Sequence, residues 1–153
     1  TCIVEGTTLS EGRGTTRPFE YIGAPWIDPA ALVAHLAARK LPGVGFRPAS
    51  FVPTFSKHAG ETCRGVQIHI LDREALAPVA TGIHLLHAIR AQDPARFAWR
   101  PGGALGMSVD LLYGSSQLRT MLDADATAEE IIATWDEPLA AYRERARAAM
   151  LYG

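Results

Sequence analysis

The chain has 153 residues, the length of one domain with a buried core of its own. Its 15 basic and 16 acidic residues leave a net charge of −1, so nothing in the charge balance favours nucleic acid or an anionic membrane surface as a partner. No apolar run approaches the roughly 20 residues of a membrane-spanning helix, and no basic-then-apolar export signal opens the chain, so no membrane association is expected.

The chain opens with a segment rich in glycine, hydroxyl and charged residues. The apolar run at residues 2–4 predicts the end of a strand, and the glycines that follow let the backbone turn. This pattern is typical of a catalytic or ligand-holding loop, and also of a solvated surface loop. The charged residues of the segment are Glu5, Glu11, Arg13, Arg17 and Glu20.

A helix and two short strands are predicted next. Asp28 is a suitable N-cap and Pro29 suits the first helical position, so a helix is expected over residues 29–40. Residues 44–47 and 51–55 are predicted to form short strands, because the prolines at positions 48 and 53 interrupt the apolar pattern.

Residues 65–71 have the clearest strand pattern of the chain. Apolar residues alternate there with Gln67 and His69, so one face of the strand is predicted to be apolar and the other to carry this polar pair.

The second half of the sequence is predicted to be almost entirely helical. Helices are expected from Pro78 to about residue 93, over residues 109–113 and over residues 117–122. A longer helix begins at a capping box of Thr127 and Glu130, and Pro138 is expected to kink or restart it. The fold class is therefore α+β, with a small antiparallel or mixed sheet covered by helices and a helical C-terminal half.

Cys2 and Cys63 are the only cysteines. Two cysteines make neither a disulfide scaffold nor a structural zinc site, so free and mostly buried thiols are predicted. A single disulfide between them is the alternative.

Several sequence blocks, taken in order, resemble one known family. They are CIVEGTTLSEGRGTTRPFE at residues 2–20, GAPWID at 23–28, LPGV at 41–44, FRP at 46–48, TFSKHAGE at 54–61 and GVQIH at 65–69. The chain resembles, from residue 2 to residue 152, the C-terminal part of the exo-β-N-acetylmuramidase (NamZ-type) glycoside hydrolases, formerly a domain of unknown function.

This resemblance implies that residues 1–153 are a single domain, the C-terminal part of a longer bacterial protein whose N-terminal Rossmann-like domain is absent here. The longer protein would recycle peptidoglycan by releasing N-acetylmuramic acid from non-reducing ends, and this domain would form one wall of its active-site cleft. The implied partners are the Rossmann-like domain and a muropeptide or other peptidoglycan-derived glycan, with no cofactor. The isolated fragment is expected to be inactive, and the sequence leaves open whether the protein is exported.

Glycoside hydrolysis usually needs a carboxylic acid for the leaving oxygen and a second group that supports the positive charge on the sugar. Glu11 and Glu5 are the predicted catalytic carboxylates, followed by Glu61 and then Glu20. The alternative for each is a surface carboxylate or one paired with an arginine. The acetamido group of the substrate can also replace an enzyme nucleophile.

Substrate binding is predicted for two further groups of polar residues. Arg13 and Arg17 carry forked donors that suit the lactyl carboxylate of muramic acid, although pairing with the nearby glutamates is the alternative. The other predicted substrate-binding residues lie on one loop and on the strand after it, and together with the N-terminal loop they are expected to form one polar concavity. They are Ser56, Lys57, His58, Glu61, Gln67 and His69.

Two other functions are open from the sequence. The chain could be a non-catalytic glycan-binding or accessory domain. It could also be a metal-dependent hydrolase that uses His58, Glu61 and His69, although their spacing matches no strong zinc pattern and no metal site is predicted.

Overall fold

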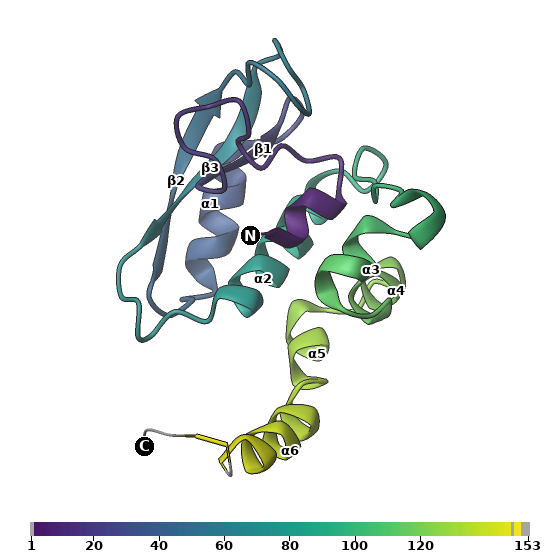
Figure 1. The fold of residues 1–153 in the computed structure, drawn as a ribbon. Coiled ribbons are helices and arrows are strands. Elements are labelled where there is room, and N and C mark those ends of the chain that lie inside the picture. Colours follow the sequence, from purple (N-terminus) through teal and green to yellow (C-terminus); the bar gives the residue numbers. More distant parts are fainter. Residues whose placement is uncertain (1, 148, 151–153) are drawn as a thin grey trace.

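A computed structural model describes residues 2–147 and 149–150. Its centre is a three-stranded antiparallel sheet in the order β1-β3-β2, made of β1 (Tyr21–Ala24), β2 (Val44–Phe51) and β3 (Cys63–Ile70). Helices gather beside this sheet and make up nearly all of the second half of the chain (Figure 1). The predicted α+β class is therefore confirmed.

The helices form a second layer and then an extension away from the sheet. The helix α1 packs against β2 and β3, and α2 packs against α1, the N-terminal 3-10 helix η1 and α5. In Figure 1, α6 lies at the end of the molecule farthest from the sheet. The bounds are η1 Cys2–Gly6, α1 Pro29–Ala38, α2 Pro78–Gln92, η2 Gly103–Leu105, α3 Ser108–Tyr113, α4 Gln117–Asp123, α5 Ala128–Ala133 and α6 Asp136–Arg147.

One core joins the sheet to these helices. Its fully buried side chains come from every layer, including Ile22 of β1, Leu32 of α1 and Ile83 of α2. Val66 of β3 belongs to the same core and Ile68 packs against it, whereas Ile70, at the end of the predicted apolar face, is 55% exposed. Gln67, on the predicted polar face, is buried as well. No helix among the described residues is long and apolar enough to cross a membrane.

The prediction of a strand at residues 2–4 is wrong, because these residues belong to η1. Ile3 and Val4 are buried, and Gly6 lies so close to α3 that a Cβ there would be 2.6 Å from the Cα of Val109. A run of three apolar residues has no period of its own, so only the packing against α2 and α3 decides its conformation.

The predicted break at Pro48 is also wrong, because β2 continues through it from Val44 to Phe51. Pro48 lies opposite Val66, and β2 is an edge strand. An edge strand has one side free of partners, so a residue without an N–H is tolerated there. The second predicted strand, over residues 51–55, is limited to Phe51, and residues 52–55 are a loop.

The last predicted helix is divided into α5 and α6. The capping box of Thr127 and Glu130 is present, but the helix is interrupted at residues 134–135, before Pro138. Pro138 therefore lies in the first turn of α6, where its missing N–H costs no intrahelical bond. Two large apolar residues of α6 stay outside the core, since Leu139 and Tyr142 are 41% and 59% exposed.

Candidate functional site

A buried carboxylate joins the N-terminal loop to the loop after β2. The Glu11 residue is only 2% exposed. The Lys57 Nζ atom lies 2.7 Å from its Oε2 atom, and the Arg13 Nε atom lies 3.2 Å from its Oε1 atom. Oε2 has no hydrogen bond of good geometry among the described residues, so we treat the short contact with Lys57 as an ion pair. The two loops that were predicted to lie side by side are therefore in contact.

Lys57 is surrounded by oxygens of the N-terminal segment. Its ammonium donates to the carbonyls of Val4 and Glu5, both at 3.3 Å, and to that of Leu9 at 2.8 Å. Burial lowers the pKa of Lys57, and Glu11 opposes this shift by stabilising the ammonium form. One side chain thus ties residues 4–11 to the loop after β2.

Arg13 links the two predicted catalytic carboxylates. Its Nη2 atom donates to Glu5 Oε1 at 3.0 Å, and its guanidinium lies 5.1 Å from the centre of the Phe19 ring. Pairing with Glu5 raises the pKa of Arg13. The side chain of Glu5 is 29% exposed, so Glu5 is the more accessible of the two carboxylates.

His58, on the loop after β2, also contacts the N-terminal segment. The His58 Nε2 atom lies 2.9 Å from the Thr8 carbonyl oxygen, and its Nδ1 atom lies 4.0 Å from Glu61 Oε1. Ser56 is exposed on this loop. We name the group of Glu5, Glu11, Arg13, Lys57 and His58 the ion-pair cluster.

A second polar group lies on β3 and beside it. Arg17 Nη1 donates to Glu20 Oε2 at 2.9 Å, and Gln67 Nε2 donates to the same oxygen at 3.1 Å. Arg47 Nε donates to Gln67 Oε1 at 2.8 Å. The pKa of Glu20 is lowered, first by Arg17 and then by Gln67. The Nε2 atom of His69 is buried and has no hydrogen-bond partner among the described residues.

The predicted site residues therefore form two clusters. Among the described side chains, no hydrogen bond or ion pair joins the ion-pair cluster to the group around Gln67. Sequence reasoning did not find Arg47. It lies directly opposite Gln67 in the β2–β3 register, and this pairing has no local signal in the sequence.

The described residues contain no group of three His, Cys, Asp or Glu side chains close enough to hold a metal ion. His58 and Glu61 are neighbours, whereas His69 belongs with the group around Gln67. The geometry therefore gives no support to a metal-dependent hydrolase built on these three residues.

The two cysteines are free, as predicted, but Cys2 is exposed and only Cys63 is buried. Burial raises the pKa of the Cys63 thiol to about 11, and Glu61 adds to this rise.

We expect iodoacetamide at pH 8 to alkylate Cys2 at least about tenfold faster than Cys63, because only about one Cys63 thiol in a thousand is ionised at that pH. Mass spectrometry of peptides at timed intervals measures both rates. The Cys2→Ser variant is the control and should take up label slowly. Equal rates for the two thiols would contradict the expectation.

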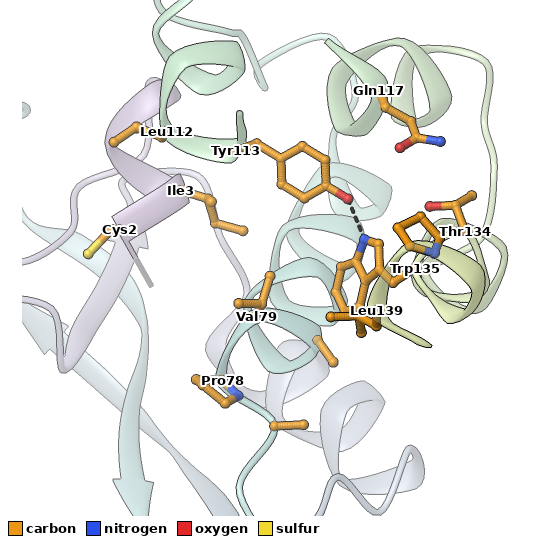
Figure 2. Close-up of a pocket in the computed structure, with 13 residues that line it drawn as sticks. Cys2, Ile3, Pro78, Val79, Leu112, Tyr113, Gln117, Thr134, Trp135 and Leu139 are labelled. Carbon is orange, nitrogen blue, oxygen red and sulfur yellow. Dashed lines mark hydrogen bonds between the residues drawn. The ribbon is translucent and has the colours of Figure 1, made fainter. Parts of the chain in front are cut away.

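A groove of about 750 Å³ lies elsewhere, between η1, α2, α3 and the segment from α5 to α6 (Figure 2). Its walls are apolar, with side chains such as Val79, Leu112 and Leu139. Trp135 Nε1 donates to the Tyr113 hydroxyl at 2.6 Å across one side of it. Among the described residues no carboxylate lines this groove, so these residues offer no general acid for glycoside hydrolysis there.

The α+β domain with these clusters matches a known family along its length. The family model described as exo-β-N-acetylmuramidase NamZ, C-terminal, matches residues 1–152. The chain therefore belongs to the family of NamZ C-terminal domains, and the resemblance found in the sequence is confirmed.

Individual relatives agree with this assignment. The chain is 40% identical over 152 residues to the peptidoglycan β-N-acetylmuramidase NamZ of Bacillus subtilis strain 168, a match that covers 99% of this chain and 36% of that protein. A DUF1343 family protein from Bacteroides fragilis is similar in structure, with a TM-score of 0.85 and 25% identity over 99% of this chain and 40% of the other. A second such protein, at 24% identity and a TM-score of 0.65 over 99% of this chain and 38% of the other, supports the fold alone. The chain thus spans little more than a third of the length of its curated relative.

Proposed function

We propose that this chain is the C-terminal part of a longer glycoside hydrolase, which releases N-acetylmuramic acid from the non-reducing ends of peptidoglycan fragments. The observation that carries the proposal is the 40% identity to the Bacillus subtilis enzyme over 99% of this chain. Because the chain spans 36% of that relative, the active-site cleft needs further walls, which we assign to an N-terminal Rossmann-like domain. This domain supplies one wall.

Within this wall, Glu5 and Glu11 are the proposed functional carboxylates, with different roles. A general acid must reach the glycosidic oxygen of the substrate, and Glu5 is accessible. Both oxygens of Glu11 face cations and the residue is 2% exposed, which favours a positioning role. Glu11 would hold Arg13, and Arg13 would hold Glu5 in place.

Arg13 is the proposed contact for the lactyl carboxylate of muramic acid. A guanidinium has five N–H donors, and the contacts to Glu5 and Glu11 use two of them. The remaining donors can bind a carboxylate. Lys57 is surrounded by protein oxygens, so we assign it to positioning. The other proposed substrate contacts are Arg17, Ser56, His58, Glu61, Gln67 and His69.

The test compares three proteins: the longer enzyme, the same enzyme without this domain, and the 153-residue chain alone. Release of N-acetylmuramic acid from peptidoglycan fragments is expected only from the first, because the cleft of the other two is incomplete. Undiminished release without this domain would contradict the proposal and favour an accessory glycan-binding role.

Glu5→Gln in the longer enzyme is expected to lower turnover about a hundredfold or more, without a change in the free energy of unfolding. Glu74→Gln, an exposed glutamate outside both clusters, is the matched control and should keep normal turnover. Unchanged turnover of Glu5→Gln would show that this carboxylate does not take part in the reaction.

A further inference from the structure

A second groove, of about 710 Å³, lies between residues 13–18 and residues 51–55. Its floor is aromatic. Tyr21 of β1 and Phe51 of β2 stack with their ring centres 5.3 Å apart and their planes at 10°. The Glu11–Lys57 pair is not part of its lining, although Arg13 is.

Glycines make room for this aromatic pair on the sheet. Tyr21 and Phe51 come from the two outer strands, so their rings meet across β3. A Cβ on Gly23 would lie 3.2 Å from an atom of the Phe51 ring, and one on Gly65 would lie 2.0 Å from the Ile22 carbonyl oxygen. Gly23 therefore leaves room for the Phe51 ring, whereas Gly65 allows β1 and β3 to approach closely.

The two walls of the groove are fixed to each other through the backbone. Gly14 has a φ of 81°, and a Cβ on it would lie 2.7 Å from the Phe55 nitrogen. The Thr54 nitrogen and hydroxyl both donate to the Gly14 carbonyl, at 2.9 and 3.0 Å. The groove is therefore preformed, which lowers the entropic cost of binding a ligand.

The lining combines apolar surface with a few polar groups. Phe55 and Val52, which are 62% and 50% exposed, contribute apolar surface to the groove. Thr16 is exposed beside them, and Arg13 is the one charged residue among the described residues of the lining. Since Glu5 and Glu11 engage two of the Arg13 donors, the groove suits a ligand with an apolar face and a polar rim.

A pyranose ring has this chemistry, because its axial C–H bonds form an apolar face and its hydroxyls surround it. We propose that the groove between residues 13–18 and 51–55 binds one sugar ring of a β-1,4-linked N-acetylhexosamine chain, stacked on Phe55 above the Tyr21–Phe51 floor. The choice of glycan rests on the proposed function. The groove would hold a sugar unit next to the ion-pair cluster, to which Arg13 belongs.

The experiment titrates the ¹⁵N-labelled 153-residue chain with N,N′-diacetylchitobiose, a neutral probe that does not depend on a lactyl carboxylate, and follows the amide chemical shifts. We expect saturable shifts at residues 13–18 and 51–55. Phe55→Ala should weaken binding about two- to tenfold, since an aromatic contact contributes about 0.5–1.5 kcal/mol. Leu71→Ala, which also truncates an exposed apolar residue, is the control and should bind normally.

No shifts at millimolar chitobiose, shifts confined to other residues, or normal binding by Phe55→Ala would each overturn the proposal. The groove could instead contact the rest of the longer enzyme. In that case chitobiose would cause no chemical-shift changes at these residues in the longer enzyme, and that result would also overturn the sugar-binding proposal. If chitobiose binds this groove but the longer enzyme releases no N-acetylmuramic acid, the proposed function is wrong and the groove proposal stands. If the longer enzyme releases N-acetylmuramic acid but the groove does not bind chitobiose, the groove proposal is wrong and the proposed function stands.

Discussion

Replacement of Glu11 by glutamine is expected to lower the free energy of unfolding by about 3 kcal/mol. The glutamate is buried, and the side chain of its partner Lys57 is only 15% exposed. The variant would leave the ammonium in a poorly hydrated site without its counter-ion, and removal of one partner of a buried pair is costly for this reason. We place the effect at the lower end of the usual range because three backbone carbonyls remain around Lys57.

Urea unfolding followed by tryptophan fluorescence measures this change. Glu74→Gln is the matched control and should shift the unfolding free energy by less than about 0.5 kcal/mol, because Glu74 is exposed. The double variant Glu11→Gln with Lys57→Met should cost less than the sum of the two single changes, since it leaves no unpaired charge. A cost below about 1 kcal/mol for Glu11→Gln alone would contradict the assignment of a positioning role.

Gly65→Ala is the second substitution with a large expected effect, a loss of about 3 kcal/mol of unfolding free energy. The added Cβ would lie 2.0 Å from the Ile22 carbonyl oxygen and 2.7 Å from the Gly23 Cα. Both are backbone atoms of β1, so the contact can be relieved only by moving the strand. The same displacement would disturb Tyr21, so binding of the sugar probe should weaken together with stability.

Gly60→Ala separates this steric effect from backbone strain. Gly60 has a φ of 79°, but a Cβ there would meet nothing within 4 Å. Only the left-handed backbone conformation should then cost free energy, about 1 kcal/mol. Urea unfolding of both variants gives the comparison. If Gly65→Ala lowered the free energy of unfolding no more than Gly60→Ala does, β1 and β3 would not approach each other this closely at residue 65.

Local sequence signals determined much of the fold. The α1 N-cap Asp28 accepts from the Ala30 and Ala31 nitrogens, and Thr127 and Glu130 form the predicted capping box. The alternation after residue 65 identified β3. These elements are encoded within one or two turns of chain, so a reader of the sequence can find them. The family resemblance likewise depends on short blocks of sequence in order.

The composition of the site was also readable, but its arrangement was not. Glycine, glutamate and arginine at residues 5–17 indicated a functional loop. The sequence could not show that Glu11 is buried or that Lys57 reaches it, because the two residues are brought together by the packing of separate loops. The sequence could not show the contact between Arg47 and Gln67 either, since that contact depends on strand register.

The tertiary structure alone decided where short or ambiguous segments belong. Residues 2–6 form a 3-10 helix because Ile3 and Gly6 fit against α2 and α3, and β2 passes through Pro48 because it is the edge strand. The aromatic floor of the proposed sugar groove joins residues 30 positions apart in the sequence, Tyr21 and Phe51. Capping and periodicity act between near neighbours, so the sequence by itself determines them. Burial, ion pairing and groove shape depend on distant segments in contact, and only the folded chain brings those segments together.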